Sequence, residues 1–227
     1  MLKKLNERLW VYPFEEERDR PNLSYIKGDK FSLAVDAGHS ADHIREFYDA
    51  LKNEGLPLPS LTVITHWHWD HTLAMHAVNG LTLANETTNL HLAEFAKRIK
   101  EEGTAFFLDW DESIKKEYAD GKEVIVTLAD MTFTGEMNFD LGNCPVHIFQ
   151  AESPHTDDST LIYLPDDEFL ILGDCTGGEF PSWTFDQAKG DKLAETITKI
   201  NPKTCLPGHW NELPTEYIIK DLLEGEC

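Results

Sequence analysis

Four side chains of types that commonly bind metals fall within six residues, in the segment 66–71 (HWHWDH). Imidazole nitrogen and carboxylate oxygen both suit Zn²⁺, with bond lengths of about 2.0–2.2 Å. Because side chains alternate in an extended segment, His66 and His68 are expected to point to the same side. A tighter backbone after them would direct Asp70 and His71 to a second ion nearby. The segment therefore predicts a metal site.

Such a site needs further ligands from elsewhere in the chain, and three candidates lie in loops. His155 follows a proline, while Asp174 and His209 each follow a glycine. Proline and glycine shape tight turns, and loops held by rigid elements often carry functional side chains. We therefore expect these three residues to converge on the 66–71 segment.

The remaining histidines fit no ligand position. A histidine taken alone is more often a packed or surface residue than a ligand. We expect a structural or surface role for His39 as well, although its place in the loop after Asp36 makes it the histidine of this group best placed for a contact with substrate. The others are expected to be structural or on the surface: His43, His76, His91 and His147.

Short β-prone runs and one helix precede the histidine-rich segment. Lys27-Gly28-Asp29-Lys30 predicts a hairpin turn. A helix is expected from Ala41 to Asn53, because apolar residues recur there at helical spacing and a glycine follows. The strands are predicted at residues 9–12, 23–26, 31–35 and 61–65.

The second half of the chain alternates between helical and β-type patterns. Helices are predicted within residues 85–120 and over residues 193–200. Strands are predicted at residues 124–128, 131–134, 146–149, 160–164 and 169–172. Two groups of strands with attached helices predict two packed sheets that helices cover on the outside.

Composition sets the broad class. A chain of 227 residues with 41% hydrophobic residues is large enough for one well-packed domain. Its net charge of -21 makes a nucleic acid an unlikely partner, because such a surface repels phosphates. The first eight residues lack the apolar run of a signal peptide, no membrane span is evident, and four scattered cysteines do not form a disulfide scaffold. A cytoplasmic location is expected.

At these residues the sequence resembles the metallo-β-lactamase superfamily, over nearly the whole chain. The family pattern is an early Asp, then His-x-His-x-Asp-His, then His, Asp and His. Here the match runs in that order through Asp36, segment 66–71, His155, Asp174 and His209. The resemblance implies an α/β fold, a four-layer αβ/βα sandwich of two mixed sheets flanked by helices. It also implies a single domain over residues 1–227, with a helical insertion at about residues 85–120.

The resemblance assigns a role to each matched residue. Asp36 would orient a ligand histidine, as supporting residues at metal sites commonly do. Asp174 would bridge two ions, expected to be Zn²⁺, although Fe or Mn also suits these donors. The first ion would bind His66, His68 and His155. The second would bind Asp70, His71 and His209.

The implied reaction is hydrolysis by a hydroxide that bridges the two ions, with Asp70 and Asp174 as the catalytic carboxylates. The stretch that begins at His155 resembles the corresponding stretch of zinc β-lactamases. The lactamases that share it, however, carry Cys where this chain has Asp174. An Asp there is typical of glyoxalase II-like thioesterases and phosphodiesterases. A small-molecule ester, thioester or lactam is therefore the expected substrate. The alternatives are an iron-dependent oxidoreductase resembling persulfide dioxygenases, a phosphodiesterase, and a non-catalytic metal-binding protein.

Three features of the sequence bear on how the substrate would be bound. Trp67 and Trp69 occupy the variable positions of the motif, where each either faces the cleft or packs against the core. The helical segment 85–120 is long enough to cap the site. Its apolar stretch 106–110 would either line the pocket or mediate dimer contacts. The oligomeric state is not predicted.

Overall fold

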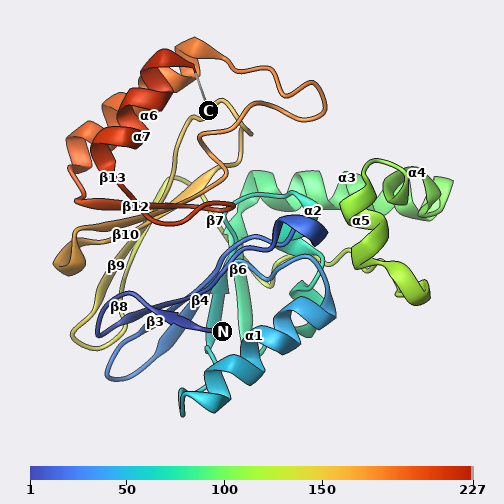
Figure 1. Cartoon of the computed structure of the whole chain (residues 1–227), viewed down its shortest axis with the longest axis horizontal. Helices are drawn as coiled ribbons and strands as arrows, with labels where there is room; N and C mark the ends of the chain where they lie inside the picture. Colours follow the sequence, from blue (N-terminus) through green and yellow to red (C-terminus); the bar gives the residue numbers. More distant parts are fainter. Residues whose placement is uncertain (226–227) are drawn as a thin grey trace.

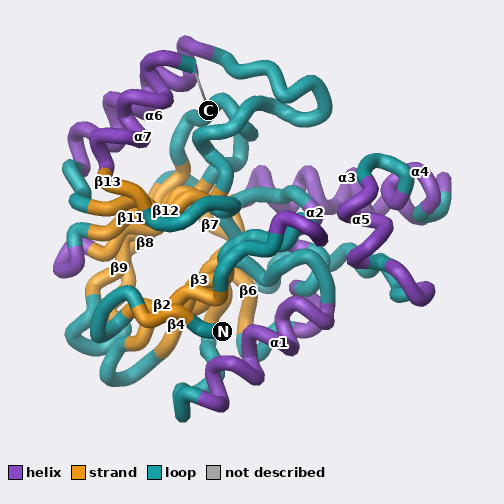
Figure 2. The backbone as a smooth tube through the Cα atoms, viewed as in Figure 1, coloured by secondary structure: helices purple, strands orange, loops and turns teal. Residues whose placement is uncertain are grey.

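The computed structural model describes residues 1–225. Figure 1 shows two β-sheets packed against each other, with α1 (Ala41–Asn53) and α3 (Glu86–Glu102) outside one sheet. The helices α6 (Gln187–Ile200) and α7 (Thr215–Glu224) lie outside the other. The same layers are evident in the secondary-structure view (Figure 2). The four-layer α/β sandwich predicted from the sequence is confirmed.

The first sheet has seven strands, in spatial order β1 to β7. Its first four strands pair antiparallel, and β4 to β7 pair parallel. The parallel part brings several carboxyl ends to one edge, where loops carry side chains. The strands are β1 (Lys3–Lys4), β2 (Leu9–Tyr12), β3 (Leu23–Lys27), β4 (Ser32–Val35), β5 (Leu61–Val63), β6 (Leu81–Asn85) and β7 (Met131–Phe133).

The second sheet has six strands in the order β13-β12-β11-β10-β9-β8. Only β11 and β12 pair parallel, so this sheet is mixed as well. The carboxyl ends of β11 and β12 therefore also lie side by side. The strands are β8 (Glu136–Asp140), β9 (Pro145–Gln150), β10 (Thr160–Leu164), β11 (Phe169–Gly173), β12 (Thr204–Pro207) and β13 (Leu213–Pro214).

Three apolar layers hold the sandwich together. The central layer joins the inner faces of both sheets, for example Val63 of β5 with Ile171 of β11. One outer layer packs α1 and α3 on the first sheet, and the other packs α6 and α7 on the second. Burying apolar surface on both faces of each sheet explains why the strands read as continuous apolar runs.

Helix α1 has the predicted bounds, and its sequence explains both ends. The Ser40 side chain accepts a hydrogen bond from the backbone N–H of His43, which caps the first turn. Ile44, Phe47 and Leu51 are buried on one face. Gly55, with a φ of 68°, lies just beyond the end of the helix. Helix α6 begins earlier than predicted, because Asp186 caps it well before Leu193.

Two sequence expectations about strands are wrong. Residues 124–128 form no strand: they run as irregular chain from the helical segment to β7, with Val124 buried. The apolar side chains of this run can be buried without a neighbouring strand. The spacing of apolar residues alone does not distinguish a buried irregular segment from a strand. Strand β5 ends at Val63 rather than at residue 65, because the Thr65 N–H donates to the Asp36 carboxylate instead of to a strand.

The predicted helical segment is present as α3, α4 (Ala105–Leu108) and α5 (Glu112–Glu117), which extend to the right in Figure 1. An ion pair buried at both ends joins α5 to the β2–β3 loop: Arg20 contacts Glu117 through two nitrogens, both at 2.8 Å. Within residues 1–225, no helix is both long and apolar enough to cross a lipid bilayer. The extent of the domain, residues 1–227, stays a prediction.

Candidate metal centre

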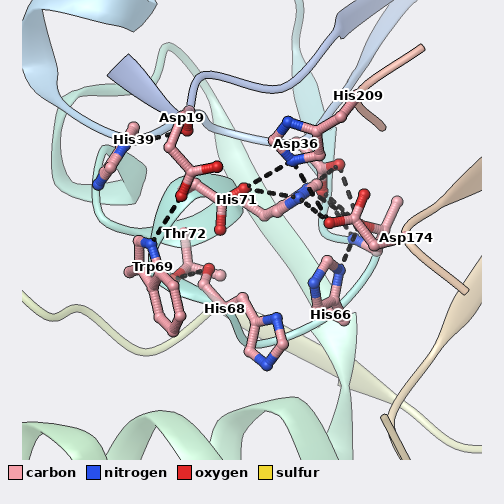
Figure 3. A network of polar contacts seen from close by, with 12 residues as sticks. Asp19, Asp36, His39, His66, His68, Trp69, His71, Thr72, Asp174 and His209 are labelled. Carbon is pink, nitrogen blue, oxygen red and sulfur yellow. Dashed lines mark hydrogen bonds and ion pairs between the residues drawn. The ribbon is translucent and has the colours of Figure 1, made fainter. Parts of the chain in front are cut away.

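The residues predicted to bind metal lie at one edge of the two sheets. Asp36 follows β4, the 66–71 segment follows β5, and Asp174 follows β11. His155 lies in the loop between β9 and β10, and His209 follows β12. Because these ends meet where the sheets face each other, the structure brings together all seven expected metal ligands (Figure 3 draws most of them).

The first group consists of three buried histidines: His66, His68 and His155. Nε2 of His155 lies 3.2 Å from Nε2 of His66 and 3.0 Å from Nδ1 of His68. Burial lowers the pKa of all three imidazoles, and the neighbouring histidines lower those of His66 and His68 further. Three uncharged ring nitrogens that point at one another present lone pairs to a common position, which is the arrangement a cation requires.

The second group alternates acids and imidazoles: Asp70, His71, Asp174 and His209. Oδ2 of Asp70 lies 3.1 Å from Nε2 of His71 and 3.0 Å from Nε2 of His209. Burial alone would raise the carboxyl pKa values, but the two imidazoles outweigh it and hold the pKa of Asp70 and Asp174 well below its usual range. The carboxylates in turn outweigh burial and raise the pKa of His71 and His209.

Asp174 lies between the two groups. Its Oδ2 is 3.3 Å from Nε2 of His71, 3.4 Å from Nε2 of His209 and 3.9 Å from Nε2 of His155. Its Oδ1 is buried without a hydrogen-bond partner among the described residues. A carboxylate that reaches both groups and keeps one oxygen unused has the geometry of a bridging ligand.

Gly208 makes room for this carboxylate. A Cβ atom at position 208 would overlap Oδ1 of Asp174 and approach Cε1 of His71 to 3.2 Å. The residue before His209 therefore cannot carry a side chain while Asp174 keeps its position. Cys175, in contrast, packs into the apolar layer under α6, on the other side of the chain.

Asp36 positions His71, as the resemblance implies. Its Oδ2 lies 2.7 Å from Nδ1 of His71, and its Oδ1 accepts a hydrogen bond of 2.8 Å from the Thr65 N–H. Asp36 has a φ of 65°, a left-handed conformation that Asp and Asn adopt more readily than most residues. The contact fixes the ring so that Nε2 faces the second group.

Replacing Asp36 with asparagine should weaken metal binding about 10- to 100-fold, because the neutral amide supports the His71 ring less well. Asparagine tolerates the left-handed backbone, so the fold should persist. Competition with a chromophoric chelator measures the affinity, and Asp49→Asn, on exposed α1 surface, is the control. Equal affinities in the two variants would contradict the assigned role of Asp36.

His39 has the structural role expected for the histidines outside the ligand set, and it is not among the described residues that line the cavity. His39 is fully buried, and its Nδ1 lies 3.0 Å and 3.1 Å from the carbonyl oxygens of Arg18 and Asp19. Its own carbonyl accepts a hydrogen bond from the Tyr118 hydroxyl at 2.7 Å. His39 thus supports the loop before β3. Two other histidines lie near the surface, as expected from the sequence, where Nε2 of His91 is 2.6 Å from Asp157 and Nε2 of His147 is 3.1 Å from Glu136.

Asp19 is the residue of the site that sequence reasoning missed. It lines the cavity next to the metal-ligand groups, and its Oδ2 accepts a hydrogen bond of 3.2 Å from the Trp69 indole N–H. Burial, and then the charge of Asp70, raise the pKa of Asp19 to about 7. The surrounding sequence, EEERDR, has the composition of a solvated charged loop, so it gave no signal.

The cavity has a volume of about 440 Å³, within the usual range for small-molecule sites. Three tryptophans contribute to its walls: Trp69, Trp183 and Trp210. Trp67 instead packs against His91 and Phe95, so the two tryptophans of the motif have different environments.

The helical segment 85–120 packs against Trp69, and its described part does not enter the cavity. None of its described residues lines the cavity, so of the two roles open to residues 106–110 the structure excludes lining the pocket, and the role in dimer contacts stays a prediction. Phe107 and Trp110 pack on the Trp69 ring at centroid distances of 6.1 Å and 5.1 Å. The segment therefore fixes Trp69, which lies between His68 and Asp70, and does not cap the opening.

Comparison with known proteins identifies the family. The model of the metallo-beta-lactamase superfamily matches residues 18–209. A metallo-beta-lactamase from Pontibacter korlensis superimposes with a TM-score of 0.74 at 17% identity, over 99% of this chain and 97% of that one. DIM-1 metallo-beta-lactamase gives a TM-score of 0.70 at 18% identity, over 100% and 98% of the two chains.

A metallo-beta-lactamase family protein from Thermus thermophilus gives a TM-score of 0.71 at 16% identity, over 98% of this chain and 80% of that one. At these identities the structural matches establish the fold alone. The sequence match spans most of the chain and includes the 66–71 segment, His155, Asp174 and His209. The chain belongs to the metallo-beta-lactamase superfamily.

Proposed function

We propose that this protein is a metal-dependent hydrolase with a dinuclear zinc centre that cleaves a small-molecule ester, thioester or lactam. One observation carries the proposal: seven donor side chains converge in two adjacent groups, and Asp174 reaches both. Their chemistry fits zinc, which favours imidazole and carboxylate ligands. Iron and manganese accept the same donors, so metal identity is part of what the experiment tests.

His66, His68 and His155 would hold one ion, and Asp70, His71 and His209 the other, with Asp174 shared. Bound there, the ions would lower the pKa of water towards neutrality and polarise the oxygen of the scissile group. No serine or cysteine competes as a nucleophile among the described residues that line the cavity.

The protein groups have defined tasks in this scheme. Asp36 holds the His71 ring in place, and the Asp70 carboxylate, once it is a ligand, is also placed to orient a water molecule. Trp69 closes one wall and excludes solvent from that side. We propose a small molecule as the substrate, because the cavity is small and the net charge of -21 disfavours nucleic acids. A cytoplasmic location forms part of the same proposal.

A combined metal and activity assay tests the proposal. Elemental analysis of the purified protein should find two zinc ions per chain. Esters, thioesters, β-lactams and phosphodiesters are then assayed before chelation, after chelation and after zinc is restored. We expect turnover of a carboxylic acid derivative that chelation abolishes and zinc restores.

Other outcomes would support different functions. Full activity in the metal-free protein would overturn the metal mechanism. One iron per chain, with oxygen consumption on a persulfide substrate, would instead establish the oxidoreductase alternative. Cleavage of phosphodiesters alone would establish a phosphodiesterase.

A further inference from the structure

The cavity next to the metal centre is acidic and aromatic beyond the ligand groups themselves. Asp19 and Asp221 lie in its walls, together with Trp183 and Trp210. Among the described residues that line it, there is no lysine or arginine. Beyond the ligand groups, a substrate in this cavity therefore meets carboxylates and indole rings, and it meets no lysine or arginine side chain among the described wall residues.

Asp19 is available to a ligand although arginines flank it in the sequence. Arg18 pairs with Glu15 at 2.6 Å, and Arg20 turns inwards to Glu117 at 2.8 Å. Asp19 itself has a φ of 50°, and it forms no ion pair among the residues that the structure describes. Its one side-chain hydrogen bond there comes from the neutral Trp69 indole.

The position of Asp19 is fixed by buried neighbours. The His39 ring contacts the Asp19 carbonyl at 3.1 Å, and the Tyr118 hydroxyl donates to the His39 carbonyl. The adjacent Arg20 is anchored through two hydrogen bonds to Glu117. A carboxylate held in place before the ligand arrives loses little entropy on binding, so it can contribute to selectivity.

We propose that this cavity selects substrates that carry a positively charged group, such as a quaternary or protonated amine, on the part distal to the scissile bond. The inference rests on the proposed hydrolase function and names the substrate class of the same site. The Asp19 carboxylate binds the cation, and Asp221 adds to the negative potential. Indole faces also attract cations, and Trp183 and Trp210 offer two such faces in the cavity walls.

The overall charge acts in the same direction. The chain has 41 acidic and 20 basic residues, so its field attracts cations and repels anions as they approach. A distal carboxylate on the substrate would face Asp19 and Asp221 without a basic partner among the described wall residues. Such substrates are expected to be the poorest of a matched series.

Three matched thioesters test the inference. They share the acyl chain and the leaving thiol, and their acyl chains end in trimethylammonium, in tert-butyl or in carboxylate. For the zinc-loaded protein, kcat/KM should be highest for the cation and lowest for the anion, with a ratio of cation to tert-butyl of about tenfold. In Asp19→Asn this ratio should fall to near one. Asp49→Asn, on the outer surface of α1, should leave all three values unchanged.

A binding experiment keeps the test independent of turnover. Methyl ketones with the same three terminal groups contain no bond that hydrolysis cleaves, and tryptophan fluorescence reports their binding. The cationic ketone should bind about tenfold more tightly than its tert-butyl counterpart, and Asp19→Asn should remove the difference.

The two experiments separate the inference from the proposed function. Selective binding of the cationic ketone without hydrolysis of any thioester would leave the inference standing and count against the hydrolase. Hydrolysis without a preference for the cation, or a preference that Asp19→Asn retains, would overturn the inference and leave the hydrolase intact.

Discussion

Replacing Asp174 with alanine is expected to lower the catalytic rate on the order of 10³-fold, which corresponds to about 4 kcal/mol of transition-state stabilisation. The same variant should retain less zinc than the unaltered protein. The reason is geometric: Asp174 is the carboxylate that reaches both groups, with Oδ2 3.3 Å from Nε2 of His71 and 3.9 Å from Nε2 of His155. In the proposed dinuclear centre, its loss would remove a donor from each ion and leave the buried His71 and the partly exposed His209 with one fewer counter-charge.

Zinc content by mass spectrometry and steady-state turnover measure the two effects together. Asp166→Ala is a matched control, because Asp166 is exposed in the turn between β10 and β11, at the opposite end of β11. It should bind zinc and turn over substrate normally. His68→Ala should resemble Asp174→Ala, because it removes one of the three histidines of the first group. A fully active, zinc-depleted Asp174→Ala protein would exclude the proposed chemistry.

Replacing Arg20 with methionine should destabilise the fold by about 3–5 kcal/mol, because it removes the hydrogen-bonded cation of the buried Glu117 carboxylate and leaves Arg18, 3.8 Å away, as a more distant counter-charge. Arg20 is 1% exposed and Glu117 is 0% exposed, and they contact each other through two hydrogen bonds of 2.8 Å. Glu117 also accepts a hydrogen bond from Ser40, the residue that caps α1. The loss of this cation would thus disturb α1, α5 and the β2–β3 loop at once.

Urea unfolding measures the loss. Lys192→Met is the control, since it breaks an exposed ion pair with Glu152 and should cost below about 1 kcal/mol. The double variant Arg20→Met/Glu117→Leu should recover much of the stability, because it removes both buried charges. Equal losses in the free energy of unfolding for Arg20→Met and Lys192→Met would show that the buried pair stabilises the fold no more than an exposed one.

The sequence was most informative where local pattern and chemistry coincide. Helix α1 has its predicted bounds, because a serine cap, an apolar face and a following glycine agree. All seven expected metal ligands converge, because each lies in a loop or, for Asp70 and His71, in the short helix α2 (Trp69–Thr72) just beyond a strand, and the parallel pairs β4–β5 and β11–β12 bring strand ends together. Their roles as ligands stay predictions.

The failures share a cause, which is that they depend on tertiary context. Residues 124–128 have β propensity but no strand beside them, so the pattern predicted a strand that does not form. Strands β1, β6, β8, β12 and β13 and helix α7 were not predicted. Asp19 reaches the cavity only because Arg20 and His39 fix its loop, and neither contact is visible in the sequence.

The candidate metal ligands and two of the tryptophans in the cavity wall differ in how tightly the surrounding structure holds them. The donors cluster at strand ends locked by contacts such as that between Asp36 and His71, whereas Trp183 and Trp210 are 58% and 68% exposed. Mutations at those two positions meet little steric opposition. Substitutions at Trp183 and Trp210 can therefore change the substrate preference, while the donor side chains keep their positions and contacts. Laboratory diversification of this protein should begin with those two tryptophans.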